Sequence, residues 1–213
     1  MFPSRLIDGY ANFLDGRFAH EREHYEALAE RGQRPEILLI GCCDSRVAPE
    51  VIFDAEPGEI FVVRNVANLV PPFEINGQFH GTSAALEFAV EGLGVKHIVV
   101  LGHARCGGIR AFAEKSAPLS DGDFIGKWTS VLAPAAAKLG APKGKPDDAY
   151  CAKLEHAAIA QSLENLRTFA GVRRRVEAAS LHLHGAYFDV ATGSLLIRDA
   201  ETGDFAPSSP VRP

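Results

Sequence analysis

Two residues that can ligate a soft metal ion, His103 and Cys106, lie close together in a short glycine-rich segment. The segment follows an apolar run, residues 97–101, whose length and β-branched residues are typical of a buried strand. A helical pattern begins at Ile109, so both side chains are expected in a tight turn between a strand and a helix. Imidazole and thiolate are common zinc ligands, so this turn could hold a metal ion.

Cys42 occupies an equivalent place earlier in the chain, because it closely follows residues 37–40, which also have the pattern of a buried strand. If the two strands are parallel neighbours, both turns lie at the carboxyl edge of one sheet, where open α/β sheets place their sites. Cys42, His103 and Cys106 could then meet as three zinc ligands. Three protein ligands leave a fourth position open for chemistry.

The charge of these three residues suits a zinc ion. Cys106 is expected at the start of a helix, where the macrodipole favours an anion and lowers the pKa of a thiol. Two thiolates and a neutral imidazole would cancel the charge of Zn²⁺. Taken singly, each residue is explained more simply as a small buried hydrophobe or a core histidine. Together, at the ends of two strands, they favour a metal site.

The elements that must position these turns indicate an α/β fold. Predicted strands cover residues 37–40, 59–64, 96–101, 181–188 and 194–198, and predicted helices cover residues 82–93, 123–139 and 147–169. Strands that alternate with helices predict a mainly parallel central sheet with flanking helices. The last strand can return through a hairpin, so we expect about four to five strands with an antiparallel edge.

Two helical patterns, residues 6–14 and 19–31, precede the first strand, and Ser4 is a candidate N-cap of the first. They cannot be crossover helices of the sheet, so residues 1–34 are expected to form an N-terminal helical arm that packs elsewhere. The proline-rich tail, residues 205–213, is expected to be loosely ordered. A length of 213 residues predicts one domain spanning residues 1–213.

Composition excludes several classes of protein. The formal charge of −5 argues against a general nucleic-acid surface, and no apolar stretch approaches the ~20 residues of a membrane span. Asp8 and Asp15 interrupt the apolar residues at the N-terminus, which therefore lacks the pattern of a signal peptide. The four cysteines are then expected as reduced thiols or metal ligands, and the protein as cytoplasmic.

Two motifs carry a resemblance to a known family: Cys-x-Asp-Ser-Arg at residues 42–46 and His-x-x-Cys-Gly-Gly at residues 103–108. In this pairing the sequence resembles the β-class carbonic anhydrases, and in particular the plant-like subtype. Residues 57–68 are similar to theirs too, and the resemblance runs from about Leu6 to Ile197.

The resemblance implies one zinc ion per chain, bound by Cys42, His103 and Cys106. It implies a lyase activity, the reversible hydration of carbon dioxide to bicarbonate and a proton, in which zinc-bound hydroxide attacks carbon dioxide. Asp44 and Arg46 would form a dyad that orients the hydroxide. Asp44 could instead bind zinc as a fourth ligand and close the site; the plant-like features favour the open state.

The resemblance also implies a substrate pocket. Phe61, Val66 and Phe88 would line an apolar pocket for carbon dioxide, with Phe88 standing where plant-like members often carry tyrosine. Bicarbonate needs donors, and Gln33 and the backbone N–H of Gly107 at a helix start would supply them.

Enzymes of this family are dimers or dimers of dimers, so a homodimer or homotetramer is implied, with Gln33 donated to the partner's site. Two alternatives stay open. One is a hydrolase of carbon disulfide or carbonyl sulfide on the same fold, and the other is a non-catalytic zinc or redox-sensing protein with a closed site. A structural zinc needs neither Asp44 nor Arg46, which argues against the second alternative.

Overall fold

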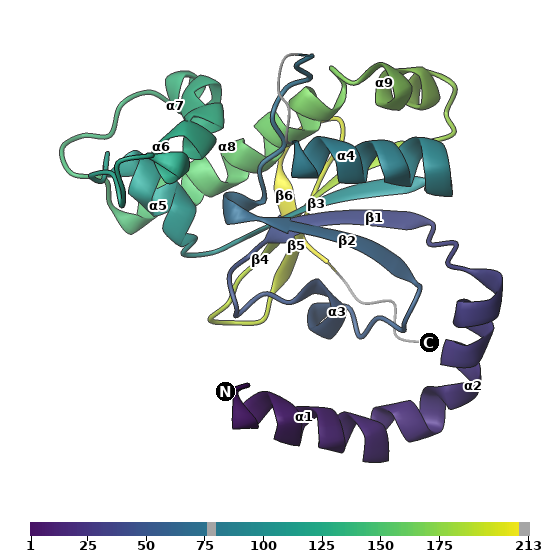
Figure 1. The fold of residues 1–213 in the computed structure, drawn as a ribbon. Helices are drawn as coiled ribbons and strands as arrows, with labels where there is room; N and C mark the ends of the chain where they lie inside the picture. Colours follow the sequence, from purple (N-terminus) through teal and green to yellow (C-terminus); the bar gives the residue numbers. More distant parts are fainter. Residues whose placement is uncertain (76–79, 209–213) are drawn as a thin grey trace.

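A six-stranded mixed sheet forms the centre of the computed structural model, which describes residues 1–75 and 80–208 (Figure 1). Its order is β2-β1-β3-β4-β5-β6. The strands are β1 (Ile37–Cys42), β2 (Ile60–Asn65), β3 (His97–His103), β4 (His182–Phe188), β5 (Leu195–Arg198) and β6 (Phe205–Pro207). Strands β1 to β4 are parallel and β5 and β6 are antiparallel, which confirms the predicted fold class.

The sixth strand, β6, corrects two expectations. The sheet has more than the expected four to five strands, and the prediction of a loose tail is wrong for Phe205–Pro207, which pairs with β5. Pro207 cannot donate a hydrogen bond to a ladder, and β6 tolerates it because it is an edge strand. Residues 209–213 of the predicted tail lie outside the described residues.

The central strands have apolar residues on both faces, because both faces of the sheet are covered there. Leu38, Ile40, Ile98 and Val100 belong to the main core cluster on one face, and none of them is exposed. Leu39 lies in a smaller cluster on the other face. Burial on both sides accounts for the nearly continuous apolar runs in these segments.

Helices cover mainly one face of the sheet. In Figure 1, α4 (Gly81–Glu87), α8 (Asp148–Leu166) and α9 (Ala170–Glu177) lie above it, and the short α3 (Pro49–Ile52) lies below. At the carboxyl edge of the parallel strands are η1 (Val66–Asn68), α5 (Gly107–Ala113), α6 (Phe124–Thr129), η3 (Ser130–Leu132) and α7 (Ala133–Leu139). None of the helices in the described residues is both long enough and apolar enough to cross a membrane.

The predicted helical segments are confirmed with changes in their extent. The segment 82–93 is helical, with a π-helical continuation, η2 (Phe88–Leu93), after α4. The segment 123–139 is divided into α6, η3 and α7, and Pro134 lies in the first turn of α7, where its missing N–H costs nothing. The segment 147–169 begins with Asp147 as N-cap but ends at Leu166.

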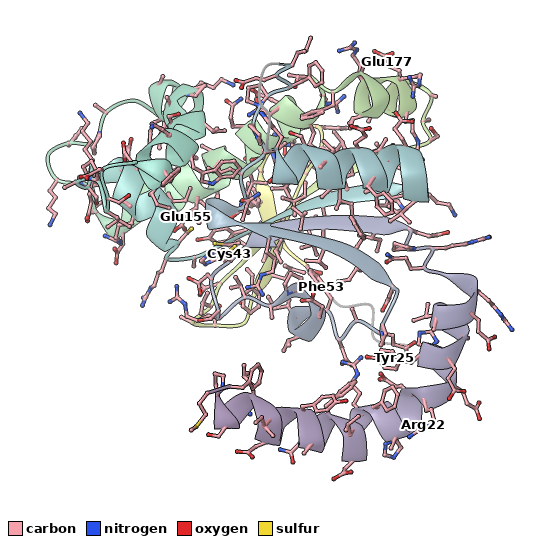
Figure 2. The ribbon with its side chains drawn as sticks, in the orientation of Figure 1. Arg22, Tyr25, Cys43, Phe53, Glu155 and Glu177 are labelled. Atoms are coloured by element: carbon pink, nitrogen blue, oxygen red, sulfur yellow. The ribbon has the colours of Figure 1, made fainter. Side chains whose placement is uncertain are left out.

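The N-terminal arm consists of α1 (Ser4–Asp15) and α2 (Arg17–Arg31), neither of which has a buried residue. Ser4 is helical, so its prediction as N-cap is wrong; Pro3 precedes the helix without a side-chain cap. In Figure 1, α2 descends from the sheet and α1 runs back below α3, and Arg17 of α2 donates to the carbonyl oxygen of Ala55 at 3.1 Å. Tyr25 packs against aromatic rings between the two helices of the arm (Figure 2). On α1, apolar side chains that are more than half exposed are Leu6, Ile7 and Tyr10.

Candidate active site

The structure brings the three predicted ligands together at the carboxyl edge of the sheet. Cys42 ends β1 and His103 ends the neighbouring parallel strand β3. Arg105 adopts a left-handed φ of 58° in the turn after β3, and this turn returns the chain so that Cys106 precedes α5. The ligand atoms of Cys42, His103 and Cys106 all lie within 4.8 Å of one another, and all three residues are buried.

The donor set fits a zinc ion. The Nδ1 of His103 lies 2.9 Å from the carbonyl oxygen of Ala104, to which it donates in the tautomer that leaves the lone pair on Nε2. That Nε2 is buried and has no hydrogen-bond partner in the described part of the chain. The Sγ atoms of Cys42 and Cys106 are 4.0 Å apart, too far for a disulfide. Two thiols and one unsatisfied imidazole nitrogen make a set that zinc binds.

Of the two thiols, Cys42 holds a negative charge more readily. Its pKa is lowered, chiefly by the hydrogen bond from Cys106 and also by the backbone N–H groups of Asp44 and Ala67. The pKa of Cys106 is raised by that same neighbour and by burial. The backbone N–H groups of Gly108 and Ile109 at the start of α5 lower the pKa of Cys106, as expected for a thiol at a helix start, but the effects of Cys42 and of burial act against them. A zinc ion would deprotonate both thiols.

Asp44 and Arg46 form a two-pronged ion pair beside this cluster. The Nε and a terminal nitrogen of Arg46 donate to the two carboxylate oxygens at 2.9 and 2.7 Å, and the backbone N–H of Arg46 donates at 3.0 Å. These hydrogen bonds hold the pKa of Asp44 well below its usual range. The carboxylate lies 4.0 Å from His103 Nε2, so it is beside the cluster while Arg46 occupies both of its oxygens.

Arg64 supports the turn after β1, and the sequence reasoning missed it. Its side chain donates to the carbonyl oxygens of Cys42 at 2.9 Å and Asp44 at 2.7 Å. Arg64 pairs with Gly41 in the register of β2 against β1, so it stands beside the turn. The apolar pattern of β2 interrupted by an arginine near its end was the available signal.

Glu155 supports the other turn, and it was missed as well (Figure 2). It is only 4% exposed on α8. Its carboxylate accepts the backbone N–H of Cys106 at 2.9 Å and the Tyr187 hydroxyl at 2.7 Å. Burial raises the pKa of this carboxyl, against the lowering effect of both hydrogen bonds. The sequence signal was a glutamate at helical spacing from the buried Cys151 and Ala158.

Glu155→Ala is expected to weaken zinc binding by about 10–100-fold, since partners that orient metal ligands typically contribute that much. The substitution leaves the Cys106 N–H buried without its acceptor. Competition with a chromophoric chelator measures the affinity. Glu164→Ala, on the same helix but exposed, is the matched control. Equal affinities in the two variants would remove Glu155 from the support of the site.

The residues predicted to bind substrate fall into two groups. Val66 and Gly107 lie at the site: a Cβ on Gly108 in α5 would come within 2.8 Å of Val66, and Gly107 begins α5 in open space. The rings of Phe61 and Phe88 pack together at a centroid distance of 5.8 Å, away from the ligands.

Phe61, Phe88 and Gln33 are not placed around the metal site of their own chain. Phe61 precedes Asn65 by four residues in β2, and Asn65 pairs with Cys42, so roughly 13 Å of strand separates them. Phe88 is 53% exposed, and Gln33 is exposed in the loop before β1. In one chain, the predicted pocket is therefore incomplete.

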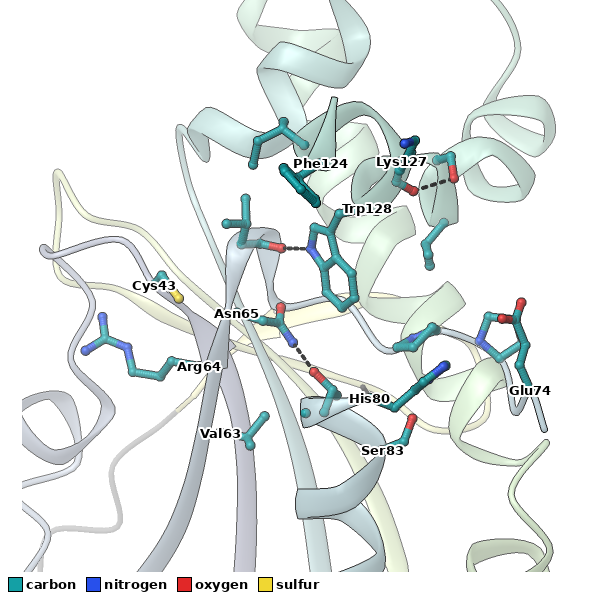
Figure 3. Close-up of a pocket in the computed structure, with 18 residues that line it drawn as sticks. Cys43, Val63, Arg64, Asn65, Glu74, His80, Ser83, Phe124, Lys127 and Trp128 are labelled. Carbon is teal, nitrogen blue, oxygen red and sulfur yellow. Dashed lines mark hydrogen bonds between the residues drawn. The ribbon is translucent and has the colours of Figure 1, made fainter. Parts of the chain in front are cut away.

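A cavity of about 780 Å³ adjoins the site (Figure 3). Cys43, Arg64, Val66 and Trp128 are among the residues that line it, and the indole N–H of Trp128 donates to the Val66 carbonyl at 2.7 Å. The cavity therefore lies next to the turns that carry the ligands, because Val66 lines it and also packs against Gly108 in α5.

The fold and the site define an α/β protein with a Cys-Cys-His metal cluster at the carboxyl edge of a mainly parallel sheet. The model of a protein family described as carbonic anhydrase matches residues 37–195. This chain belongs to the carbonic anhydrase family, in its β class. Members of the β class are zinc enzymes, and the Cys42, His103 and Cys106 cluster can bind a metal.

Two curated relatives from Arabidopsis thaliana are similar over most of this chain. Beta carbonic anhydrase 5, chloroplastic, is 40% identical over 174 residues, which is 81% of this chain and 57% of that protein. Beta carbonic anhydrase 6, mitochondrial, is 37% identical over 198 residues, or 91% of this chain and 67% of that protein. This chain thus spans little more than half the length of the first relative.

Solved structures show the same fold. The β-carbonic anhydrase CcaA has a TM-score of 0.84 at 28% identity, covering 98% of this chain and 92% of that one. The Coccomyxa enzyme in complex with acetazolamide has a TM-score of 0.75 at 31% identity, covering 90% and 84%. A structure from a study of two tetrameric β-carbonic anhydrases of the ascomycete Sordaria macrospora has a TM-score of 0.75 at 30% identity, covering 95% of this chain and 98% of that one. These matches do not favour the hydrolase or the non-catalytic alternative.

Proposed function

We propose that this protein is a zinc-dependent carbonic anhydrase that interconverts carbon dioxide and bicarbonate. The observation that carries this proposal is the buried cluster of Cys42, His103 and Cys106 with the Asp44–Arg46 ion pair beside it. A structural zinc site is closed by four protein ligands, whereas this cluster offers three. The family to which the chain belongs points to the same reaction.

In this proposal zinc, when bound by the three ligands, supplies Lewis acidity and a nucleophile drawn from water at neutral pH. Asp44 keeps its charge because Arg46 donates to both of its oxygens, so it can accept a hydrogen bond from the nucleophile and orient it. Arg46 is itself held by the carbonyl oxygen of Arg105 at 3.2 Å. The carboxylate is thereby restrained from turning onto the metal.

The remaining groups bind the two forms of the substrate. Val66 presents an apolar surface suited to uncharged carbon dioxide. The backbone N–H of Gly107 at the start of α5 can donate to the anionic bicarbonate, and no side chain obstructs it. The product proton passes to buffer.

Stopped-flow hydration of carbon dioxide with a pH indicator tests the activity. The purified protein is expected to accelerate hydration, to lose this activity when zinc is removed by a chelator, and to regain it when zinc is restored. Hydration that is unaffected by complete removal of zinc, or absent from fully zinc-loaded protein, would exclude the proposal.

We also propose that the active unit is a homodimer or a dimer of dimers. Both helices of the N-terminal arm lack buried residues, so a second copy is a natural place to bury their apolar face. Gln33, Phe61 and Phe88 lie away from the metal cluster of their own chain and are free to complete the site of a partner. The Sordaria macrospora relatives are described as tetrameric, which agrees with this assembly.

Mixed dimers that combine a Cys42→Ala chain with a Gln33→Ala chain test whether Gln33 acts on the partner's site. In the shared arrangement, zinc on the Gln33→Ala chain meets Gln33 from the other chain, and one intact site is rebuilt. Losing this neutral donor beside an anion costs about 1–3 kcal/mol, so Gln33→Ala alone should be weakened but active.

The hydration rate per zinc in isolated mixed dimers is therefore expected to exceed that of the Gln33→Ala parent. No gain over this parent, or an active protein that is strictly monomeric, contradicts the shared site. Dimers that combine wild-type and Cys42→Ala chains give the rate of one intact site for comparison.

The extent and location of the protein complete the proposal. We take residues 1–213 as a single domain with the arm at residues 1–34, since one sheet with its helices accounts for the buried core. A cytoplasmic location rests on the composition, while the two curated relatives are named as chloroplastic and mitochondrial. Cell fractionation with an antibody to the native protein tests it.

A further inference from the structure

Three histidines gather at the amino edge of the sheet, at the opposite end from the candidate active site. His97 begins β3, and His182 and His184 lie near the start of the neighbouring parallel strand β4. His97 pairs with His182 in register, and His184 follows two residues later, so all three side chains point to the same face of the sheet. The length of β3 separates His97 from His103, roughly 20 Å at ~3.3 Å per residue.

The rings lie close enough to share an ion. His97 Nδ1 is 3.1 Å from His184 Nε2. Two nitrogens bound to one tetrahedral zinc ion, each at ~2.0–2.1 Å, stand about 3.4 Å apart, so this pair is already near the spacing of two ligands. The His182 ring centroid lies 5.4 Å from that of His97 and 6.5 Å from that of His184. As placed, the ligand atoms of the three histidines do not all lie within 4.8 Å of one another, so His182 can join the other two only if its side chain turns toward them.

Two charged residues, Glu36 and Lys96, adjoin the histidines at this edge of the sheet. Burial lowers the pKa of His184, and the neighbouring His97 and His182 lower it further. The backbone carbonyl of Glu36 accepts the His97 N–H at 3.0 Å, so the Glu36 residue lies at the same edge. The Glu36 carboxylate is ion-paired with Lys96, the main cause of its lowered pKa, so the adjacent ammonium group offsets the negative charge it brings to this edge.

We propose that His97, His184 and His182 form a second metal site, which binds a divalent transition-metal ion that prefers imidazole ligands, such as nickel, copper or zinc. The site is built from side chains of two adjacent strands whose backbone positions are fixed by the ladder. It contains no thiolate or carboxylate from the active site, so its occupation is independent of the zinc held by Cys42, His103 and Cys106. Imidazole ligands select these metals over magnesium and calcium.

Nickel is the probe of choice because elemental analysis distinguishes it from the zinc of the active site. Untagged, zinc-loaded protein is dialysed against Ni²⁺ at neutral pH, and nickel and zinc per chain are measured after removal of unbound metal. The wild type is expected to bind one nickel ion per chain while its zinc content stays unchanged.

Variants locate the site. His97→Asn and His184→Asn are each expected to lose the nickel and to retain zinc and carbon dioxide hydration. His20→Asn, a replacement of an exposed histidine on α2, serves as control and should bind nickel as the wild type does. Failure of wild type to bind nickel, nickel gained only in exchange for zinc, or undiminished nickel in both cluster variants would each overturn the proposal. Circular dichroism establishes that the variants are folded.

Discussion

Replacement of Cys106 by serine is expected to remove zinc and carbon dioxide hydration together. The Cys106 side chain is 2% exposed, and its sulfur faces that of Cys42 at 4.0 Å. A serine hydroxyl stays protonated at neutral pH and is a poor zinc ligand, so the variant keeps only one thiolate and one imidazole. Elemental analysis and stopped-flow hydration of the same preparation measure the two losses.

Cys43→Ser provides the matched control for this experiment. Cys43 is adjacent to a ligand but exposed, and it lies outside the cluster. The control should therefore retain both zinc and activity. Full zinc occupancy in Cys106→Ser and also in Cys42→Ala would show that the metal binds elsewhere.

Replacement of Arg46 by alanine is expected to lower hydration by about 10–100-fold while zinc is retained. Arg46 supplies all three hydrogen bonds that the Asp44 carboxylate accepts within the described part of the chain. The backbone N–H remains in the variant, but both side-chain bonds are lost. The freed carboxylate can then turn toward the metal and occupy the position that the nucleophile needs.

Zinc content measured beside the hydration rate distinguishes this effect from loss of the metal. Arg173→Ala, an exposed arginine far along the chain, is the control and should behave as the wild type does. Wild-type rates in Arg46→Ala would remove the ion pair from the mechanism. Arg46→Lys should be weakened too, because an ammonium group cannot donate to both oxygens in the fork that arginine provides.

The pH dependence of carbon dioxide hydration distinguishes the protonation of Asp44 from that of other groups. Because Arg46 holds the pKa of Asp44 below its usual range, the carboxylate stays ionised as pH falls from about 8 to 6. The stability that this ion pair contributes is present above the ordinary pKa of aspartate and is lost only as pH falls through the lowered one. Protonation of Asp44 therefore does not account for a loss of hydration between about pH 8 and 6.

The ligands could be predicted because their types and their positions after strands are both visible in the sequence. Gly41 pairs with Leu101 in the register of β1 against β3, and this alignment brings the two turns to one edge. Apolar runs are enough to predict such strands. Because neighbouring parallel strands end at the same edge of the sheet, the turns that follow them lie close together. Asp44 and Arg46 are separated by one residue, so their pairing is local.

Arg64 and Glu155 could not be assigned in the same way. Each acts on a backbone group of a residue distant in sequence, Arg64 on Cys42 and Glu155 on Cys106. Such contacts depend on strand register and on where α8 packs, and neither is contained in local spacing. Glutamate side chains are rarely buried, so the sequence alone gives no reason to expect Glu155 in the core. Its role is visible only once the packing of α8 is known.

The C-terminal strand and the substrate pocket show two further limits. A three-residue strand that contains proline resembles a tail, and β6 forms only because β5 offers it an edge. Phe61 and Phe88 were predicted to line a pocket with Val66, yet in one chain their rings pack at the far end of β2. A single sequence does not show which copy of the chain a residue serves.

The zinc-edge X-ray absorption spectrum of the purified, active protein tests the proposed metal centre most directly. It is expected to show one zinc environment with two sulfur ligands at about 2.3 Å and two nitrogen or oxygen ligands at about 2.0–2.1 Å. This result corresponds to Cys42, Cys106, His103 and one further position. An active protein whose zinc has four sulfur ligands, or none, would contradict the assignment.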